Sequence, residues 1–137
     1  MPSDRKHKIL IVEDEDKVRE VFSDALKAKG FIVIEAVDGN KAKELWIKEQ
    51  PDLVLLDILL PEIDGFQLLK TMRAYPSPHH SDTPVVVITN LYEKSDILRA
   101  SKYSIKQFMV KANHTTDEVI QRIEEVFERE HRKKTIG

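Results

Sequence analysis

The chain has 137 residues, a length that fits one domain and can bury a hydrophobic core without disulfides or bound metals. Its 22 basic and 24 acidic side chains are well mixed, which argues against nucleic acid or an anionic membrane as the main partner. It has no cysteine and no apolar stretch long enough for a signal peptide or a membrane span, so we expect a cytoplasmic protein without thiolate sites.

Five short apolar runs of β type alternate with amphipathic helical patterns. The runs are KILIV (8–12), FIVIEA (31–36), DLVLLD (52–57), PVVVIT (84–89) and QFMV (107–110). Most of them are continuously apolar, as expected for strands that are covered on both faces of a sheet.

Five helices are expected between and after these runs. The first has an apolar stripe from Val18 to Leu26 and ends at Gly30, a natural C-terminal cap. The second is centred on Trp46, which we interpret as a core residue, and the third follows Asp64. The fourth covers about 92–102, with Ile97 and Leu98 as its apolar residues. The last begins with TTDE (115–118), which has the spacing of a capping box.

Strand–helix alternation of this kind predicts an α/β domain with a parallel sheet and helices on both faces. We expect the domain to span 8–131, between an N-terminal tail (1–7) and a basic C-terminal tail (132–137). The proline-punctuated stretch 75–84 is expected to be a solvated loop, and its His79, His80 and Asp82 are better explained by solvation than as a metal site.

Charged and polar residues stand at the ends of four of the five predicted strands. Glu13 and Asp14 stand at the end of the first, Asp57 at the end of the third, Thr89 and Asn90 at the end of the fourth, and Lys111 at the end of the fifth. The carboxyl ends of parallel strands share one edge of a sheet, where ligands of doubly wound folds bind. Asp57, a lone carboxylate in an otherwise apolar run, is therefore expected to meet two further acids, a hydroxyl and an ammonium.

Three crowded carboxylates repel one another, and a hard divalent cation such as Mg²⁺ resolves the conflict while it keeps open positions for a phosphoryl oxygen. Lys111 and Thr89 supply a positive charge and a donor for the same group, and Asp57 can act as the nucleophile. Each residue also has an ordinary explanation: Asp14 can cap a helix, a threonine can pack and a lysine can be solvated. Their joint occurrence at successive strand ends favours the functional interpretation.

The motifs KILIVEDE, LLDILLPEIDG, VVVIT and FMVK resemble those of the receiver domain of two-component response regulators. The resemblance runs from about residue 8 to residue 130, nearly the whole chain. It implies a doubly wound, flavodoxin-like sheet of five parallel strands in the order 2-1-3-4-5.

The resemblance also implies a role for each site residue. Asp57 is the phosphoacceptor, and Mg²⁺, for which Mn²⁺ can substitute, is held by Asp14, Asp57 and the backbone carbonyl of Leu59, with Glu13 acting largely through water. The phosphoryl group is bound by Thr89, Asn90 and Lys111, and the switch residues are Thr89 and Phe108.

The implied function is a switch and not an enzyme with a metabolic substrate, although slow autophosphorylation and autodephosphorylation belong to it. The phosphoryl donor is a phosphohistidine on a sensor histidine kinase or a phosphotransfer protein. The output is a downstream protein, or a second copy in a homodimer, that binds the face built from the fourth helix, the fifth strand and the fifth helix.

Three positions depart from the family pattern. Asn90 stands where a small residue is usual and is expected to slow phosphotransfer, autodephosphorylation or both. Ala112 stands where a cis proline is common, so we expect a trans Lys111–Ala112 bond, because a cis bond without proline costs about 2.5–4 kcal/mol. Ser104-Ile105 replaces a usual Gly-Ala in the turn before the fifth strand.

Other functions remain as alternatives. A receiver-like scaffold that is never phosphorylated would not need the full set of acids, threonine and lysine. An aspartate-nucleophile phosphohydrolase usually has a second acid two residues after the nucleophile, where this chain has Leu59, and the acidic EDED segment would repel the phosphate of a flavin. The sequence leaves no room for an effector domain after residue 130, so we expect a stand-alone regulator or a piece of a longer chain.

Overall fold

Five parallel strands form a single sheet in the computed structural model, which describes residues 6–136. The strands are β1 (Lys8–Val12), β2 (Ile32–Ala36), β3 (Leu53–Leu56), β4 (Val85–Thr89) and β5 (Gln107–Val110). Their order is β2-β1-β3-β4-β5, and every neighbouring pair is parallel, so the predicted fold class is confirmed. Each strand begins and ends within one residue of its predicted bounds.

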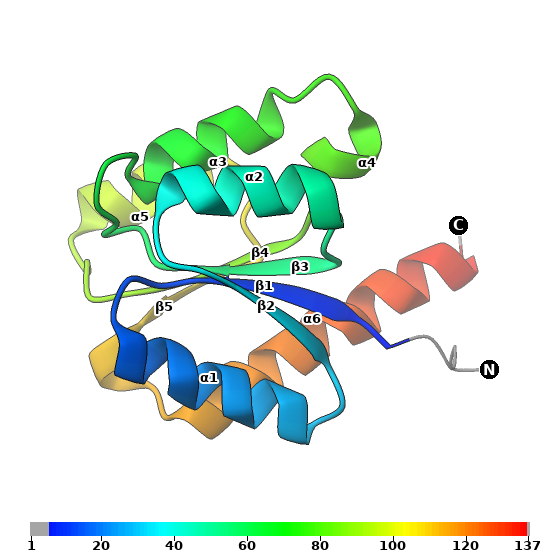
Figure 1. Ribbon diagram of the computed structural model, residues 1–137. Coiled ribbons are helices and arrows are strands. Elements are labelled where there is room, and N and C mark those ends of the chain that lie inside the picture. The colour runs from blue at the N-terminus through cyan, green and yellow to red at the C-terminus, as the bar shows by residue number, and fades with distance from the viewer. Residues whose placement is uncertain (1–5, 137) are drawn as a thin grey trace.

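Helices cover both faces of the sheet (Figure 1). On one face lie α2 (Gly39–Glu49), α3 (Gly65–Arg73), α4 (Pro78–Ser81) and α5 (Lys94–Ser101). On the other lie α1 (Asp16–Ala28) and α6 (Thr116–Ile136). A short 3₁₀ helix, η1 (Lys111–Asn113), links β5 to α6. No helix in the described part of the chain is long and apolar enough to cross a membrane.

Alternate residues of each central strand enter different core layers. In β1, Leu10 and Val12 belong to the layer beneath α2 and α3, whereas Ile9 and Ile11 belong to the layer facing α1 and α6. All four side chains are at most 1% exposed. Burial on both faces explains why the strand sequences are continuously apolar.

Local signals in the sequence account for several helix ends. Thr115 Oγ1 accepts a hydrogen bond from Glu118 N (3.1 Å), and Thr115 N donates to Glu118 Oε1 (3.1 Å), so the predicted capping box is present. Asp64 caps α3 by accepting from Gln67 N (2.9 Å). Gly30 has φ +94° just after α1, a conformation that favours glycine at a helix end.

Two expectations about the helices need correction. The stretch 75–84 is not all loop, because Pro78 begins the one-turn helix α4, where its fixed φ suits the first turn. The expected fourth and fifth helices are therefore α5 and α6. Ile97 and Leu98 do not form a buried stripe on α5: they are 39% and 65% exposed, and Ala100 is the buried residue.

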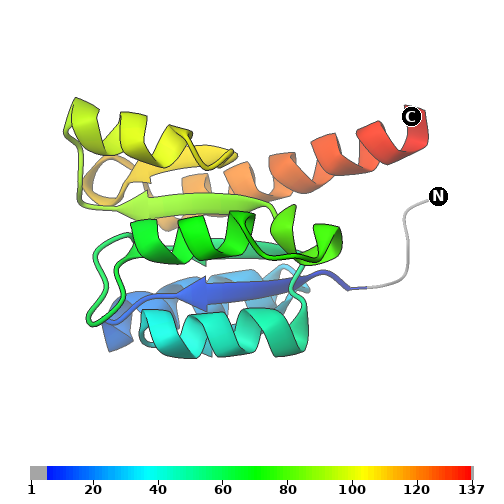
Figure 2. The same cartoon turned by 90° about the horizontal axis from the view of Figure 1, so that it is seen from above.

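The expected tails differ from the structure in extent. Residues 1–5 and 137 lie outside the described residues, whereas 132–136 continue α6 and form no separate tail. In Figure 2, α6 extends past the sheet on the side where β1 begins. There the ring of Phe127 stacks on that of His7, with the ring centroids 4.2 Å apart.

Arg73 holds the turn before β5. Its guanidinium donates hydrogen bonds to the backbone carbonyls of Tyr103 (2.7 Å), Ser81 (2.8 Å) and Thr83 (2.7 Å). The following Ser104 has φ +55°, in the left-handed region that favours glycine. The peptide bond between Lys111 and Ala112 is trans, as predicted.

Candidate functional site

The register of the sheet brings the predicted site residues to one edge. Val12 of β1 lies beside Leu56 of β3, so the residues that come next in the chain, Glu13 and Asp57, are neighbours. Thr89 lies beside Val110, the residue before Lys111. The four strand ends that were predicted to converge do so because all of these strands run in the same direction.

Three carboxylates form a tight cluster at this edge. One oxygen atom each from Glu13, Asp14 and Asp57 lies within 4.8 Å of the other two. No other group of three or more potential metal ligands occurs within residues 6–136, so His79, His80 and Asp82 do not form one. The Nε2 atom of His80 instead lies 3.2 Å from the carbonyl oxygen of Ile47.

Asp57 is buried and held from three directions. Its residue surface is 3% exposed, and its backbone N–H donates to the carbonyl of Val12 (3.0 Å). Its Oδ1 atom accepts a hydrogen bond from Leu59 N (2.9 Å), and its Oδ2 atom accepts one from Lys111 Nζ (2.7 Å). These contacts explain how a lone acid is accommodated in an apolar run, because a buried carboxylate is tolerated when it is paired and hydrogen-bonded.

Lys111 bridges two of the acids. Its Nζ atom lies 2.6 Å from Glu13 Oε1 and 2.7 Å from Asp57 Oδ2, and its side chain is 13% exposed. Burial lowers the pKa of Lys111, but the hydrogen bonds to Asp57 and Glu13 outweigh burial and place that pKa above its ordinary value. The ammonium therefore stays charged within the site.

Glu13 is the most deeply buried acid of the cluster. Burial raises its pKa above the ordinary value, and the nearby charge of Asp57 acts in the same direction, whereas the contacts with Lys111 and Glu15 N oppose them. The second oxygen of the Glu13 carboxylate, Oε2, accepts a hydrogen bond from Glu15 N (3.0 Å).

Asp14 differs from its two neighbours because it is exposed. Within the described residues, its carboxylate has no hydrogen bond or ion pair, and it does not cap α1, whose N-cap residue is Glu15. The helix-cap explanation of Asp14 is therefore excluded. Asp14 and Leu59 line a hollow of about 370 Å³ that also reaches Pro61 and Asp64.

The donor set fits Mg²⁺, because all three side chains offer carboxylate oxygens, the ligands that hard cations prefer. The three carboxylates and the Lys111 ammonium together carry a net charge of −2, which a divalent cation would neutralise. Asp14, which has no other partner among the described residues, and Asp57 are the residues that would hold it, and Leu59 lies at the hollow beside them.

The remaining predicted residues lie at the end of β4, just after it and within β5. Thr89 is fully buried, and its Oγ1 atom lies 3.4 Å from Leu91 N, from which it accepts a hydrogen bond. Asn90 is exposed, and Phe108 is half-buried against the core layer beneath α2 and α3. One residue that sequence reasoning did not identify, Arg19, contacts the backbone of Glu13. The only sequence signal for it is the Asp16–Arg19 spacing of three residues, which favours an ion pair on a helix.

The chain is similar in sequence to a protein family and to known proteins. The family model "Response regulator receiver domain" matches residues 9–124. The probable transcriptional regulator ycf27 of Porphyridium aerugineum is 32% identical over 107 residues, which cover 78% of this chain and 42% of that protein. The regulatory protein AtoC of Escherichia coli is 37% identical over 105 residues, which cover 77% of this chain and 22% of AtoC. The chain thus spans less than half the length of these curated relatives.

Solved structures agree with the sequence comparison. A putative response regulator from Chloroflexus aurantiacus superposes with a TM-score of 0.80 at 28% identity, covering 89% of this chain and 98% of that one. The BeF3-activated N-terminal receiver domain of Klebsiella pneumoniae RstA superposes with a TM-score of 0.74 at 27% identity, covering 85% and 95%.

Proposed function

This chain belongs to the response regulator receiver domain family, and on that basis we propose that it is a phosphorylation-dependent switch with Asp57 as its phosphoacceptor. The observation that carries the proposal is the convergence of Glu13, Asp14 and Asp57 within 4.8 Å. Carboxylates clustered at the carboxyl edge of the sheet repel one another. A divalent cation, which can also bind a phosphoryl group, would relieve this repulsion.

In the proposed reaction, one carboxylate oxygen of Asp57 attacks the phosphorus atom of a phosphohistidine on a sensor kinase or phosphotransfer protein. A P–O bond forms, the P–N bond breaks, and the imidazole leaves with the bonding electron pair. Mg²⁺, when bound, neutralises charge on the acids and on the phosphoryl group. The hydrogen bonds from Leu59 N and Lys111 Nζ orient the Asp57 carboxylate for this attack.

Lys111 has a second role in this proposal. Its ammonium, which pairs with Asp57 Oδ2 at 2.7 Å before reaction, is released to bind a phosphoryl oxygen once Asp57 carries the phosphoryl group. Thr89 would exchange its contact with Leu91 N (3.4 Å) for the same group. Movement of Thr89 leaves space for Phe108 to turn inward from its half-buried position.

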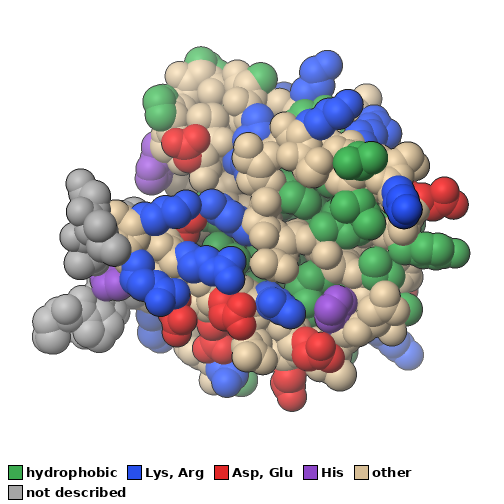
Figure 3. Space-filling model, turned by 180° about the vertical axis from the view of Figure 1, so that it is seen from behind, with side chains coloured by type: hydrophobic (Ala, Val, Ile, Leu, Met, Phe, Trp, Pro, Cys, Tyr) green, Lys and Arg blue, Asp and Glu red, His purple; other side chains and the backbone are tan. Residues whose placement is uncertain are grey.

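We place the output surface on α5, β5 and α6, next to the switch residues. Three apolar side chains of α5 and the turn before it are exposed there: Tyr92 (73%), Leu98 (65%) and Ile97 (39%). Figure 3 shows hydrophobic side chains on this side of the molecule, away from the two termini. Exposed apolar side chains grouped in this way favour a protein partner.

The proposal is tested by incubating the protein with a small phosphodonor and Mg²⁺ and measuring its intact mass. We expect the wild type to gain one phosphoryl group and Asp57→Asn to gain none. Wild-type protein that gains no mass would instead favour a constitutive scaffold, and equal gains in both proteins would reject Asp57 as the acceptor.

A further inference from the structure

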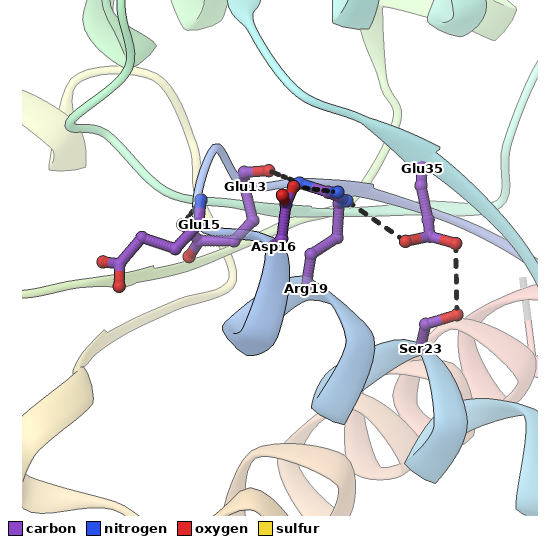
Figure 4. A network of polar contacts seen from close by, with 6 residues as sticks. All are labelled: Glu13, Glu15, Asp16, Arg19, Ser23 and Glu35. Atoms are coloured by element: carbon purple, nitrogen blue, oxygen red, sulfur yellow. Dashed lines mark hydrogen bonds and ion pairs between the residues drawn. The ribbon is translucent and has the colours of Figure 1, made fainter.

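Arg19 of α1 reaches back to the edge of the sheet and joins three acceptors (Figure 4). Its Nη1 atom donates to the backbone carbonyl of Glu13 (2.9 Å), and its Nη2 atom donates to Asp16 Oδ1 (2.6 Å). Its Nε atom donates to Glu35 Oε1 (3.2 Å) on β2. The Arg19 side chain is 14% exposed, whereas its partner Asp16 lies largely in solvent, so the contact with the Glu13 carbonyl is the more shielded of the two.

The guanidinium is itself held from two elements. Asp16 belongs to the first turn of α1, and Glu35 belongs to β2, where its other oxygen, Oε2, lies 3.5 Å from the Ser23 hydroxyl. The hydrogen bond to Asp16, and the negative charge of both acids, raise the pKa of Arg19 above its ordinary value. A planar guanidinium with fixed donor directions is well suited to hold a carbonyl in one orientation.

The contact with Glu13 matters because the next residue in the chain is Asp14. The Asp14 carboxylate has no hydrogen bond or ion pair within residues 6–136, so its place depends on its backbone. Glu13 N donates to Ala36 O (3.1 Å), and Arg19 holds Glu13 O, so both sides of this residue are fixed. Because a peptide unit is planar, fixing Glu13 O also fixes the N–Cα bond of Asp14.

We propose that Arg19 is a positioning residue for the divalent-cation site and holds the Asp14 carboxylate beside Asp57 through the Glu13 carbonyl. The inference rests on the proposed function, since it concerns the same Mg²⁺ site. Arg19 touches neither the cation nor the phosphoryl group. It acts as an outer partner of a ligand, and loss of such partners typically weakens metal binding 10–100-fold.

Electrostatics alone predicts the opposite effect. Arg19 carries a positive charge near a site for a divalent cation, so removing that charge, and with it the cation that pairs with Asp16 and Glu35, would tighten Mg²⁺ binding. A weakening of binding on loss of Arg19 therefore identifies positioning. A general loss of stability does not produce this result either, because the dissociation constant of the folded protein does not depend on how stable that protein is.

The experiment is a calorimetric titration of the unphosphorylated full chain with Mg²⁺. We expect Arg19→Met, which keeps the aliphatic bulk and removes every donor, to raise the Mg²⁺ Kd roughly tenfold. Arg19→Lys keeps the charge, but its single nitrogen atom lacks the planar fork by which Arg19 uses three nitrogen atoms for its three acceptors, so its Kd should lie between those of Arg19→Met and the wild type. The control is Arg73→Ala, which removes another arginine that holds backbone carbonyls: it should lower the melting temperature and leave the Kd unchanged.

The outcomes separate this inference from the proposed function. If the wild type binds Mg²⁺ and Arg19→Met binds it equally or more tightly, the inference is wrong and the proposed function stands. If the wild type binds no Mg²⁺, both are wrong. Should Arg19→Met fail to fold, Arg19→Lys decides: weaker binding supports the inference, and a wild-type Kd overturns it.

Discussion

Replacing Asp14 by asparagine should stabilise the protein without Mg²⁺ and abolish its stabilisation by Mg²⁺. The reason is the charge balance of the site. Lys111 pairs with Glu13 and Asp57 at 2.6 and 2.7 Å, whereas Asp14 has no cationic partner among the described residues. In the absence of a cation, the Asp14 charge therefore only adds repulsion.

The size of the effect can be worked out from the geometry. Two unit charges 4.8 Å apart repel by about 0.9 kcal/mol in bulk water and by about 3.5 kcal/mol at an effective dielectric constant of 20. Asp14 is exposed, and Lys111 offsets part of the charge of its neighbours, so we expect Asp14→Asn to stabilise the Mg²⁺-free protein by about 1 kcal/mol. For a domain of this size that corresponds to a rise in melting temperature of roughly 3–5 °C.

The assay is thermal or urea unfolding in EDTA and again in excess Mg²⁺. Mg²⁺ at ten times its Kd should stabilise the wild type by about 1.4 kcal/mol, because it binds only the native state, and should have little effect on the variant. Asp24→Asn, which removes an exposed acid of α1 outside the cluster, is the matched control and should change stability by less than about 0.5 kcal/mol. If Asp14→Asn changes the free energy of unfolding in EDTA no more than this control does, the three acids do not repel one another in the Mg²⁺-free protein and the prediction is wrong.

Two further predictions concern the kinetics of the switch and its last helix. Asn90 is exposed beside Thr89, so Asn90→Ala should give the attacking water better access to the phosphoryl group and shorten the half-life of the phosphorylated protein. Intact mass measured over time gives this half-life. An unchanged or longer half-life would contradict the prediction. Hydrogen bonds with Thr115 hold the pKa of Glu118 below its ordinary value, so the carboxylate stabilises the native state above about pH 4.3, and this contribution is lost as the pH falls through the lowered pKa. The wild type should therefore be more stable than Glu118→Gln near neutral pH, and the two unfolding curves should converge in acid. A difference that persists in acid would show that the capping carboxylate is not its cause.

Local patterns in the sequence were enough to predict an α/β domain with a parallel sheet, whereas the strand order came from the family resemblance. Each strand was a short apolar run, and the ends of α1, α3 and α6 carried their own signals in Gly30, Asp64 and the TTDE segment. These signals depend on a few neighbouring residues, so they can be recognised in the sequence. The weaker helix, α5, shows the limit: Ile97 and Leu98 have suitable spacing, yet the helix buries Ala100. An apolar residue is a candidate for burial, but the elements packed around a helix decide which of its faces is turned toward the core.

The sequence alone also determined that acids, a threonine and a lysine end four strands, and the rule that parallel strands share a carboxyl edge placed them together. Only the tertiary structure decided how these residues contact one another. Lys111 pairs with both Glu13 and Asp57, Asp14 has no partner within the described residues, and Arg19 holds the Glu13 carbonyl. Lys111 and Asp57 lie 54 positions apart in the chain, and Arg19 and Glu35 lie 16 apart. Contacts over such separations depend on strand register and helix packing, which no local pattern of residues encodes.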